Sequence, residues 1–205
     1  MKIQALALIT ALVLPTLAIA DNKTPGANTS DKTADKPTKL SEGDVTIISH
    51  VHHVNQLEID VGKAALKSGT ESVKSYGNML VSDHQSADKD LAALAKKHGL
   101  TTIPAEKPQT DEAKQEQKDT TKQVAHLKTL KGAEFDREFL AMMVTDHDKE
   151  VARIETSIGT ASDPDLRTLL TSIKPVLQRH ADEARNLQKN PQTSATQPTN
   201  PPTNR

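Results

Sequence analysis

The chain has 205 residues, with 26 Lys and Arg against 27 Asp and Glu, and a formal net charge of -1. Such balanced charge, together with one Tyr, two Phe and no Trp, argues against nucleic-acid binding, which relies on basic surfaces and on aromatic side chains that stack on bases. The absence of cysteine excludes disulfides, thiolate nucleophiles, iron–sulfur clusters and cysteine-ligated zinc, whereas the chain has eight histidines.

Residues 1–20 have the pattern of a secretory signal peptide. Met1 and Lys2 give a basic start, a run of apolar residues follows, and Ala18-Ile19-Ala20 has the small-x-small pattern of a cleavage site. A retained membrane anchor is the alternative, since about 20 apolar residues can span a bilayer. We predict cleavage, and therefore a periplasmic protein with no transmembrane domain once the signal is removed.

Two further segments are too polar to build a hydrophobic core. Residues 21–42 are rich in Thr, Asp, Lys and Asn, and residues 190–205 are rich in Pro, Thr, Gln and Asn. We predict that both are disordered, because neither can bury enough apolar surface to fold. Residues 43–189 lie between them and have the length of one domain.

Four long stretches of this domain carry apolar residues at helical spacing, and no stretch alternates like a β-strand. Ser41 and Asp44 have the spacing of a capping box at the start of the first helix, and Gly159 is predicted to end the third. Residues 99–131 are polar and in part helical, and form a long crossover between the second and third helices. The sequence therefore predicts an all-α, ferritin-like four-helix bundle. Its helices cover residues 41–67, 70–98, 133–158 and 162–187.

One polar residue interrupts each apolar helix face near its middle. These residues are Glu58, His84, His147 and His180. Helices that pack up and down would bring them to a similar depth in one core, where imidazole and carboxylate ligands suit a transition metal such as Fe, Mn, Zn or Cu. The alternative is a metal-free core in which hydrogen bonds satisfy these groups, since a buried carboxylate needs a cation or hydrogen bonds.

Four acidic residues lie beside these interruptions. They are Asp83, Asp146, Glu150 and Glu183. We predict that Asp83 and Asp146 orient the imidazoles, as carboxylates commonly do around metal sites. Glu150 and Glu183 could share a helix face with His147 and His180, but for these two we favour the alternative, open to all four acids, of a solvated position or a pair on the helix surface. The cluster at His50, His52 and His53 points in several directions around its helix, and His98 and His126 are predicted to be surface residues.

A repeated motif and several shorter ones accompany these positions. Residues 79–84 read Met-Leu-Val-Ser-Asp-His and residues 142–147 read Met-Met-Val-Thr-Asp-His. The other motifs are Asn55-Gln56-Leu57-Glu58-Ile59, Gly132-Ala133-Glu134-Phe135-Asp136-Arg137, Asp163-Pro164-Asp165-Leu166 and Lys174-Pro175-Val176-Leu177-Gln178-Arg179-His180. In these motifs the chain resembles the bacterial family called domain of unknown function 4142. Over about residues 44–187, this resemblance implies an exported protein with a ferritin-like helical fold.

The resemblance implies no particular reaction. Di-iron members of the wider ferritin-like group place Glu-x-x-His motifs on two helices. No such motif supplies His84, His147 or His180 here, which argues against a di-iron oxidase centre and leaves a mononuclear site or none.

We therefore expect an exported bundle that binds a transition metal in its core and acts in metal handling or stress protection. The alternative is a non-catalytic structural or interaction module of the cell envelope. We predict no catalytic residues, because the sequence has no Ser-His-Asp order, phosphate-binding loop or His-Glu-x-x-His motif. A homo-oligomer or an envelope partner is compatible with either function.

Overall fold

The computed structural model describes residues 39–190. This part of the chain contains five α-helices and no β-strand, which confirms the prediction of an all-α protein. The predictions for residues 1–38 and 191–205, including the signal peptide and the C-terminal tail, lie outside the described residues. The helices are α1 (Glu42–Ser68), α2 (Glu71–Lys97), α3 (Asp111–Leu127), α4 (Gly132–Thr160) and α5 (Pro164–Lys189).

The described part has one helix more than the four predicted. α3 forms within the predicted crossover, and its polar sequence leaves it only two buried residues, Val124 and Leu127. The other four helices match the predicted ones to within a few residues. α4 passes through Gly159 to Thr160, so the predicted helix end at Gly159 was wrong. The fold also begins slightly earlier than predicted, because Leu40 is already buried in the core.

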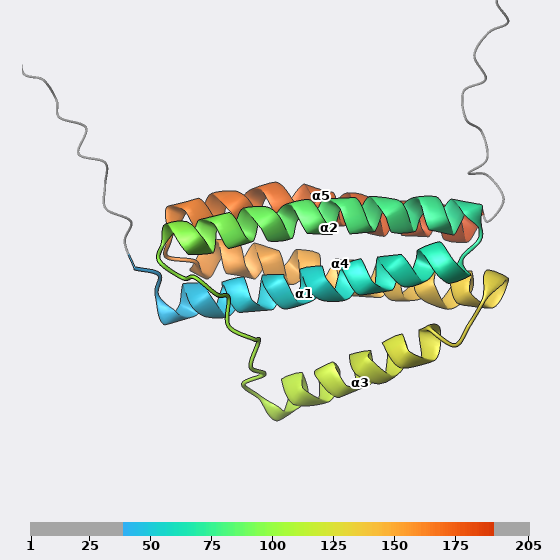
Figure 1. The fold of residues 1–205 in the computed structure, drawn as a ribbon, viewed down its shortest axis with the longest axis horizontal. Coiled ribbons are helices and arrows are strands. Elements are labelled where there is room, and N and C mark those ends of the chain that lie inside the picture. Colours follow the sequence, from blue (N-terminus) through green and yellow to red (C-terminus); the bar gives the residue numbers. More distant parts are fainter. Residues whose placement is uncertain (1–38, 191–205) are drawn as a thin grey trace, which may run out of the picture. The chain divides into compact units, whose positions relative to one another are not determined.

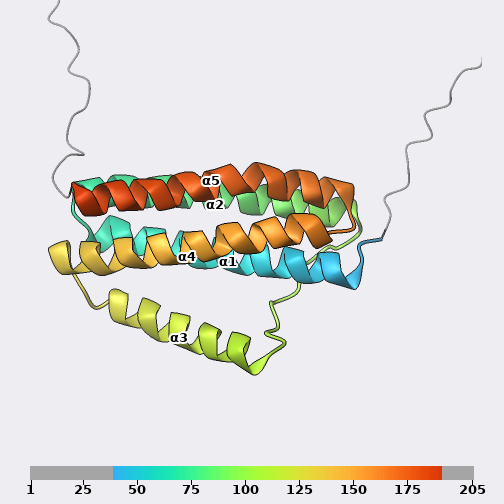
Figure 2. The same ribbon diagram turned by 180° about the vertical axis from the view of Figure 1, so that it is seen from behind.

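The four long helices form two antiparallel hairpins that pack on each other (Figures 1 and 2). α1 packs mainly on α2 and α4 mainly on α5, while α2 contacts α5 and α1 contacts α4 across the hairpins. The connection from α2 to α4 runs back along the length of the bundle and contains α3. This helix packs beside α1 and α4. The second hairpin therefore starts at the same end of the bundle as α2.

The first hairpin brings two helix backbones very close together at Gly62 and Gly77. A Cβ atom added at Gly77 would lie 2.8 Å from the Cβ of Ala65 and 2.9 Å from the carbonyl oxygen of Gly62. Real Cβ atoms essentially never come closer than 3.0 Å to such atoms. These glycines therefore set the spacing between α1 and α2.

Asp44 joins the start of α1 to the connection between α4 and α5. Its carboxylate completes the predicted capping box with Ser41 and also accepts a 2.9 Å hydrogen bond from the backbone N–H of Ser162. The hydroxyl of Ser162 donates a further hydrogen bond to the same carboxylate. Burial raises the pKa of Asp44, but the hydrogen bonds from Ser162 and Ser41 outweigh it and lower the pKa to about 2.

The apolar core consists of two clusters, one toward each end of the bundle. The first includes Tyr76, Phe135 and Phe139, and the second includes Ile48 and Leu170. On every long helix, the positions between the two clusters carry buried polar side chains. These are Asn55 and Glu58 on α1, His84 on α2, His147 and Glu150 on α4, and His180 on α5. The predicted site therefore lies in a polar layer at mid-length.

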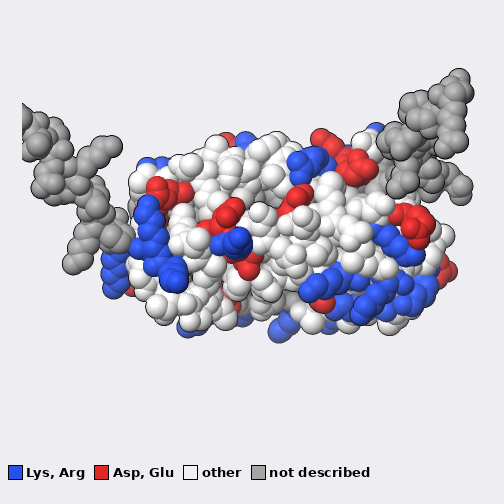
Figure 3. Space-filling view, turned by 45° about the horizontal axis from the view of Figure 1, so that its top comes forward, with Lys and Arg blue, Asp and Glu red and all other residues white. Residues whose placement is uncertain are grey.

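Charges of both signs are spread over the outer surface, and Lys and Arg gather toward one end of the face seen in Figure 3. None of the five helices is long and apolar enough to cross a membrane.

Candidate metal site

Three of the four residues predicted as metal ligands come together in the polar layer. His84, His147 and His180 are 3%, 2% and 0% exposed. One ring nitrogen of each lies within 4.8 Å of the corresponding nitrogens of the other two. The ring centroids are 5.1–5.8 Å apart. Three helices thus present three imidazoles to one point.

Each imidazole is held by a hydrogen bond from its outer ring nitrogen to an oxygen. The acceptors are an amide oxygen, a backbone carbonyl and a carboxylate, none of which has a proton to donate, so the ring nitrogen is the donor in every case. The bonds are His84 Nδ1 to Asn55 Oδ1 at 2.9 Å, His147 Nδ1 to the Met143 carbonyl at 2.9 Å, and His180 Nε2 to Asp83 Oδ2 at 2.9 Å. This is the arrangement in which metal-binding histidines are usually fixed.

Burial keeps the three imidazoles neutral. It lowers the pKa of His84 well below its ordinary value, and the neighbouring His180 and His147 lower it further. Burial, together with the charge of His180, lowers the pKa of His147 to about 4. For His180, burial again lowers the pKa and outweighs the opposing effect of Asp83. At neutral pH the rings therefore carry one proton each.

The inner nitrogens consequently carry lone pairs. Because the single proton of each ring sits on its outer nitrogen, the lone pairs are on His84 Nε2, His147 Nε2 and His180 Nδ1. His147 Nε2 and His180 Nδ1 are 3.2 Å apart. His84 Nε2 is buried and has no hydrogen-bond partner among residues 39–190. The three imidazoles thus present acceptor nitrogens to the centre of the layer.

Glu58 is buried in the same layer but lies outside the group formed by the three imidazoles. Its Oε2 atom has no hydrogen-bond partner among the described residues. Burial, followed by the charges of Asp146 and Glu150, raises the pKa of Glu58 to about 8. The structure therefore separates the predicted ligand set into three convergent imidazoles and one adjacent carboxylate.

The four flanking acids have different surroundings. Asp83 precedes His84 in the sequence but bonds His180 across the bundle. Glu150 accepts hydrogen bonds from His50 rather than from a core imidazole, at 3.1 and 3.2 Å. Asp146 and Glu183 are half-buried and form no hydrogen bond with the three imidazoles. Only Asp83 thus contacts an imidazole of the group.

Sequence reasoning missed two residues that position the imidazoles. Asn55 lies three residues before Glu58 on the same helix face, a spacing that marks it as a further polar interruption of the stripe. The hydroxyl of Tyr76 donates a 3.0 Å hydrogen bond to the backbone carbonyl of His180 and so ties α2 to α5 at the site. Nothing in the spacing of Tyr76 indicates this contact.

His98 was wrongly predicted to be a surface residue. Its side chain is only 4% exposed, and its Nε2 lies 3.5 Å from a carboxylate oxygen of Asp163. The end of α2 is covered there by the start of α5, a contact between distant segments that the local polar sequence does not reveal. His126 is exposed, as predicted.

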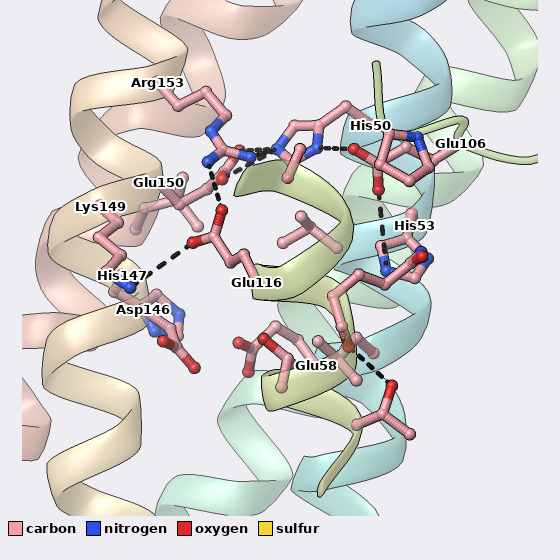
Figure 4. A pocket seen from close by; sticks show the side chains of 18 of the residues that line it. His50, His53, Glu58, Glu106, Glu116, Asp146, His147, Lys149, Glu150 and Arg153 are labelled. Carbon is pink, nitrogen blue, oxygen red and sulfur yellow. Dashed lines mark hydrogen bonds and ion pairs between the residues drawn. The ribbon is translucent and has the colours of Figure 1, made fainter. Parts of the chain in front are cut away.

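Two cavities reach the imidazole group from opposite sides. The larger, about 310 Å³, lies among α1, α3 and α4 and is lined by both His84 and His147 (Figure 4). The smaller, about 170 Å³, lies between α2 and α5 and is lined by His84 and His180. His84 therefore separates the two cavities.

Residues 29–187 match a family described as "Domain of unknown function (DUF4142)". No curated protein matches the chain. Among solved structures, the chain is similar to a "DUF305 fragment from Deinococcus radiodurans", with a TM-score of 0.63 and 18% sequence identity over 73% of this chain and 97% of that one. At this identity the likeness concerns the fold alone. The family match spans most of the sequence and includes every residue of the imidazole group, so the chain belongs to the DUF4142 family.

Proposed function

We propose that this protein binds one transition-metal ion in its core through His84 Nε2, His147 Nε2 and His180 Nδ1. The observation that carries the proposal is the convergence of three buried lone pairs whose rings are each fixed from outside. The 3.2 Å between His147 Nε2 and His180 Nδ1 is close to the roughly 3.3 Å expected between two ligands of a tetrahedral ion at about 2.0–2.1 Å.

The donor set narrows the choice of metal. Three neutral nitrogens favour Zn, Cu or Fe over Mn, because Mn suits carboxylate, carbonyl and water oxygens. A tetrahedral ion with three protein ligands keeps one further position. We assign that position to an oxygen ligand on the side of the larger cavity, which Glu58 lines together with His84 and His147.

The metal-free alternative explains the polar layer less well. A hydrogen-bonded core built to fix packing would satisfy its own members. Here Asn55 Nδ2, Glu58 Oε2 and His84 Nε2 are all buried without a partner among the described residues. Each such group costs about 1–3 kcal/mol. A cation can engage His84 Nε2 and Glu58 Oε2, and an oxygen ligand on that cation can accept from Asn55 Nδ2, so a bound metal is the simpler explanation.

The proposed setting of this site is a ferritin-like bundle exported to the periplasm, with a role in metal handling or stress protection. Support for the architecture comes from two helical hairpins joined by a connection that spans the bundle. Support for export comes from the signal-peptide pattern of residues 1–20. We assign no reaction to the site.

The test is the metal content of the purified protein. Wild-type protein and a His84→Ala, His147→Ala variant are analysed for Fe, Mn, Zn and Cu after dialysis. A His52→Ala, His126→Ala variant removes two imidazoles outside the group and serves as the matched control. We expect about one equivalent of metal in the wild type and control and none in the core variant. Equal content in all three, or none in any after reconstitution, would refute the proposal.

A further inference from the structure

Two carboxyl groups of the larger cavity, those of Glu58 and Asp146, form no ion pair with another described residue, although the charge of Lys149 acts on Asp146 from a distance. Glu58 lines this cavity, is 4% exposed and leaves Oε2 without a partner among the described residues. Asp146 lines it from α4, and no hydrogen bond or ion pair joins its carboxylate to another residue within 39–190. Figure 4 shows both side chains beneath α3, directed into the space between α1 and α4.

The basic side chains that α1 and α4 contribute to this cavity are all paired with acids (Figure 4). The paired side chains are more exposed than the imidazoles, and the pairs reduce the positive charge that would otherwise repel a cation, although Lys149 and Arg153 share the single carboxylate of Glu116. The pairs are His50 with Glu106 at 2.7 Å and with Glu150 at 3.1 Å, His53 with Glu106 at 3.8 Å, and Lys149 and Arg153 with Glu116, both at 3.5 Å. Lys118 also lines the cavity but lies on the exposed surface of α3.

The cavity between α2 and α5 lacks this arrangement. Its inner carboxylate, Asp83, accepts hydrogen bonds from both His180 and Arg179, at 2.9 and 2.6 Å. Its other acid, Asp90, is exposed. A cation entering from this side would meet a carboxylate that already has two donors.

We propose that a metal ion reaches the three imidazoles through the cavity between α1, α3 and α4, and that the carboxylate of Asp146 draws it inward. This inference rests on the proposed metal site and adds the route by which the metal ion enters it. A carboxylate without an ion-pair partner inside a cleft attracts cations and accelerates their association, in a manner that salt weakens. Asp146 is half-buried and precedes His147 on α4, whereas Glu58 is buried and, with its pKa raised to about 8, is mostly uncharged at neutral pH.

The test compares loading rates rather than affinities. Metal-free protein is mixed with Co²⁺, and the visible absorption of the bound ion is followed by stopped flow. The variant is Asp146→Asn, which keeps the side-chain shape and removes the charge. The matched control is Asp90→Asn, which makes the same change in the cavity between α2 and α5. The Co²⁺ bound at saturation is measured in the same samples, and the series is repeated at higher salt.

We expect Asp146→Asn to load about tenfold more slowly than wild type and to lose most of the salt dependence, because electrostatic steering typically contributes factors of about 10 or more. Asp90→Asn should load at the wild-type rate. Equal rates for Asp146→Asn and wild type, or a larger effect of Asp90→Asn, would overturn the route while leaving the metal site standing. Loss of Co²⁺ at saturation in Asp146→Asn would make Asp146 a ligand and also overturn it. Failure of the wild type to bind Co²⁺ would refute the proposed function itself.

Discussion

His147 Nε2 and His180 Nδ1 face each other at 3.2 Å, while the outer nitrogen of each ring already donates a hydrogen bond. Two neutral imidazoles held this way direct lone pairs at each other, which is unfavourable unless a cation lies between them. The carboxylate of Asp83 enforces this arrangement, because it can accept but cannot donate when ionised.

Replacing Asp83 by Asn should therefore weaken metal binding without removing a ligand. An amide can present either its oxygen or its nitrogen to His180, so the proton of that ring is free to move to Nδ1, where the metal would bind. We expect the Kd for Zn²⁺ to rise about 10- to 100-fold, as is usual when an outer partner of a ligand is lost. Competition with a chelator measures this. Asp182→Asn, an exposed acid two residues after His180, should retain the wild-type Kd.

Glu58→Gln should change how the stability of the metal-free protein depends on pH. The folded-state pKa of Glu58 is raised from 4.5 to about 8, so its stabilising contribution is complete below pH 4.5 and is lost as the pH rises through 8. Gln mimics the protonated form. We expect the variant to match wild type near pH 4.5 and to be more stable by a few kcal/mol above pH 8, since one pKa unit corresponds to about 1.4 kcal/mol. Urea unfolding measures this free energy. A difference between variant and wild type that stays the same at every pH would contradict the prediction.

Asp44→Asn should have the opposite pH signature. The folded-state pKa of Asp44 is lowered from 3.8 to about 2, so its contribution is present above pH 3.8 and lost as the pH falls through 2. We expect the variant to lose about 2 kcal/mol of unfolding free energy at pH 7 and to approach wild type near pH 2. Glu42→Gln removes an exposed acid of the same first helical turn and should change stability little. A loss as large in Glu42→Gln would point to the helix dipole instead.

The two ends of α3 should respond differently to Glu116→Gln. Val124 and Leu127 pack into the core at the C-terminal end, whereas Glu116 holds the N-terminal half through ion pairs with Lys149 and Arg153. Exposed pairs contribute only about 0–1 kcal/mol, so this half is weakly held. We expect amide exchange of residues 111–120 to accelerate several-fold in the variant and that of residues 124–127 to stay unchanged. Asp119→Asn, whose partners lie within α3, is the control.

Two Gly→Ala substitutions should have opposite signs although both sites are helical. At Gly77 the added Cβ would lie 2.8 Å from the Cβ of Ala65, so we expect a loss of about 1–3 kcal/mol from overpacking. At Gly159 nothing lies within 4 Å, and Ala should stabilise by about 0.5–1 kcal/mol through its better helix propensity. Thermal unfolding distinguishes the two outcomes. Stabilisation by Gly77→Ala would mean that the hairpin can separate.

Much of the helical fold could be predicted because its burial pattern is periodic in the sequence. On α5 the apolar residues at helical spacing are all buried: Leu166, Leu170, Ile173, Leu177, Ala184 and Leu187. On α1 the pattern is less decisive, because Ile47 and Ile48 are both apolar and only Ile48 is fully buried. The extra helix α3 has no such stripe, so its polar residues predicted only partial helix.

The periodicity along each helix predicted which site residues face the core, but not how they meet. The inward positions of His84, His147 and His180 follow from their place in apolar stripes. The partners that fix them come from other helices or from the backbone, as Asp83 does for His180, and a spacing rule along one helix cannot supply the register between helices. The same limit explains why Glu58 was grouped with the imidazoles.

The division of the core into two apolar clusters has a consequence for folding cooperativity. Each apolar cluster stabilises one half of the bundle. The section between the clusters contains buried polar atoms that have no hydrogen-bond partner among the described residues. A ligand bound in this section would couple the unfolding of the two halves. It would also raise the free energy of unfolding by an amount that grows with the ligand concentration. The resistance of the folded chain to unfolding and proteolysis would then report how much metal its surroundings contain.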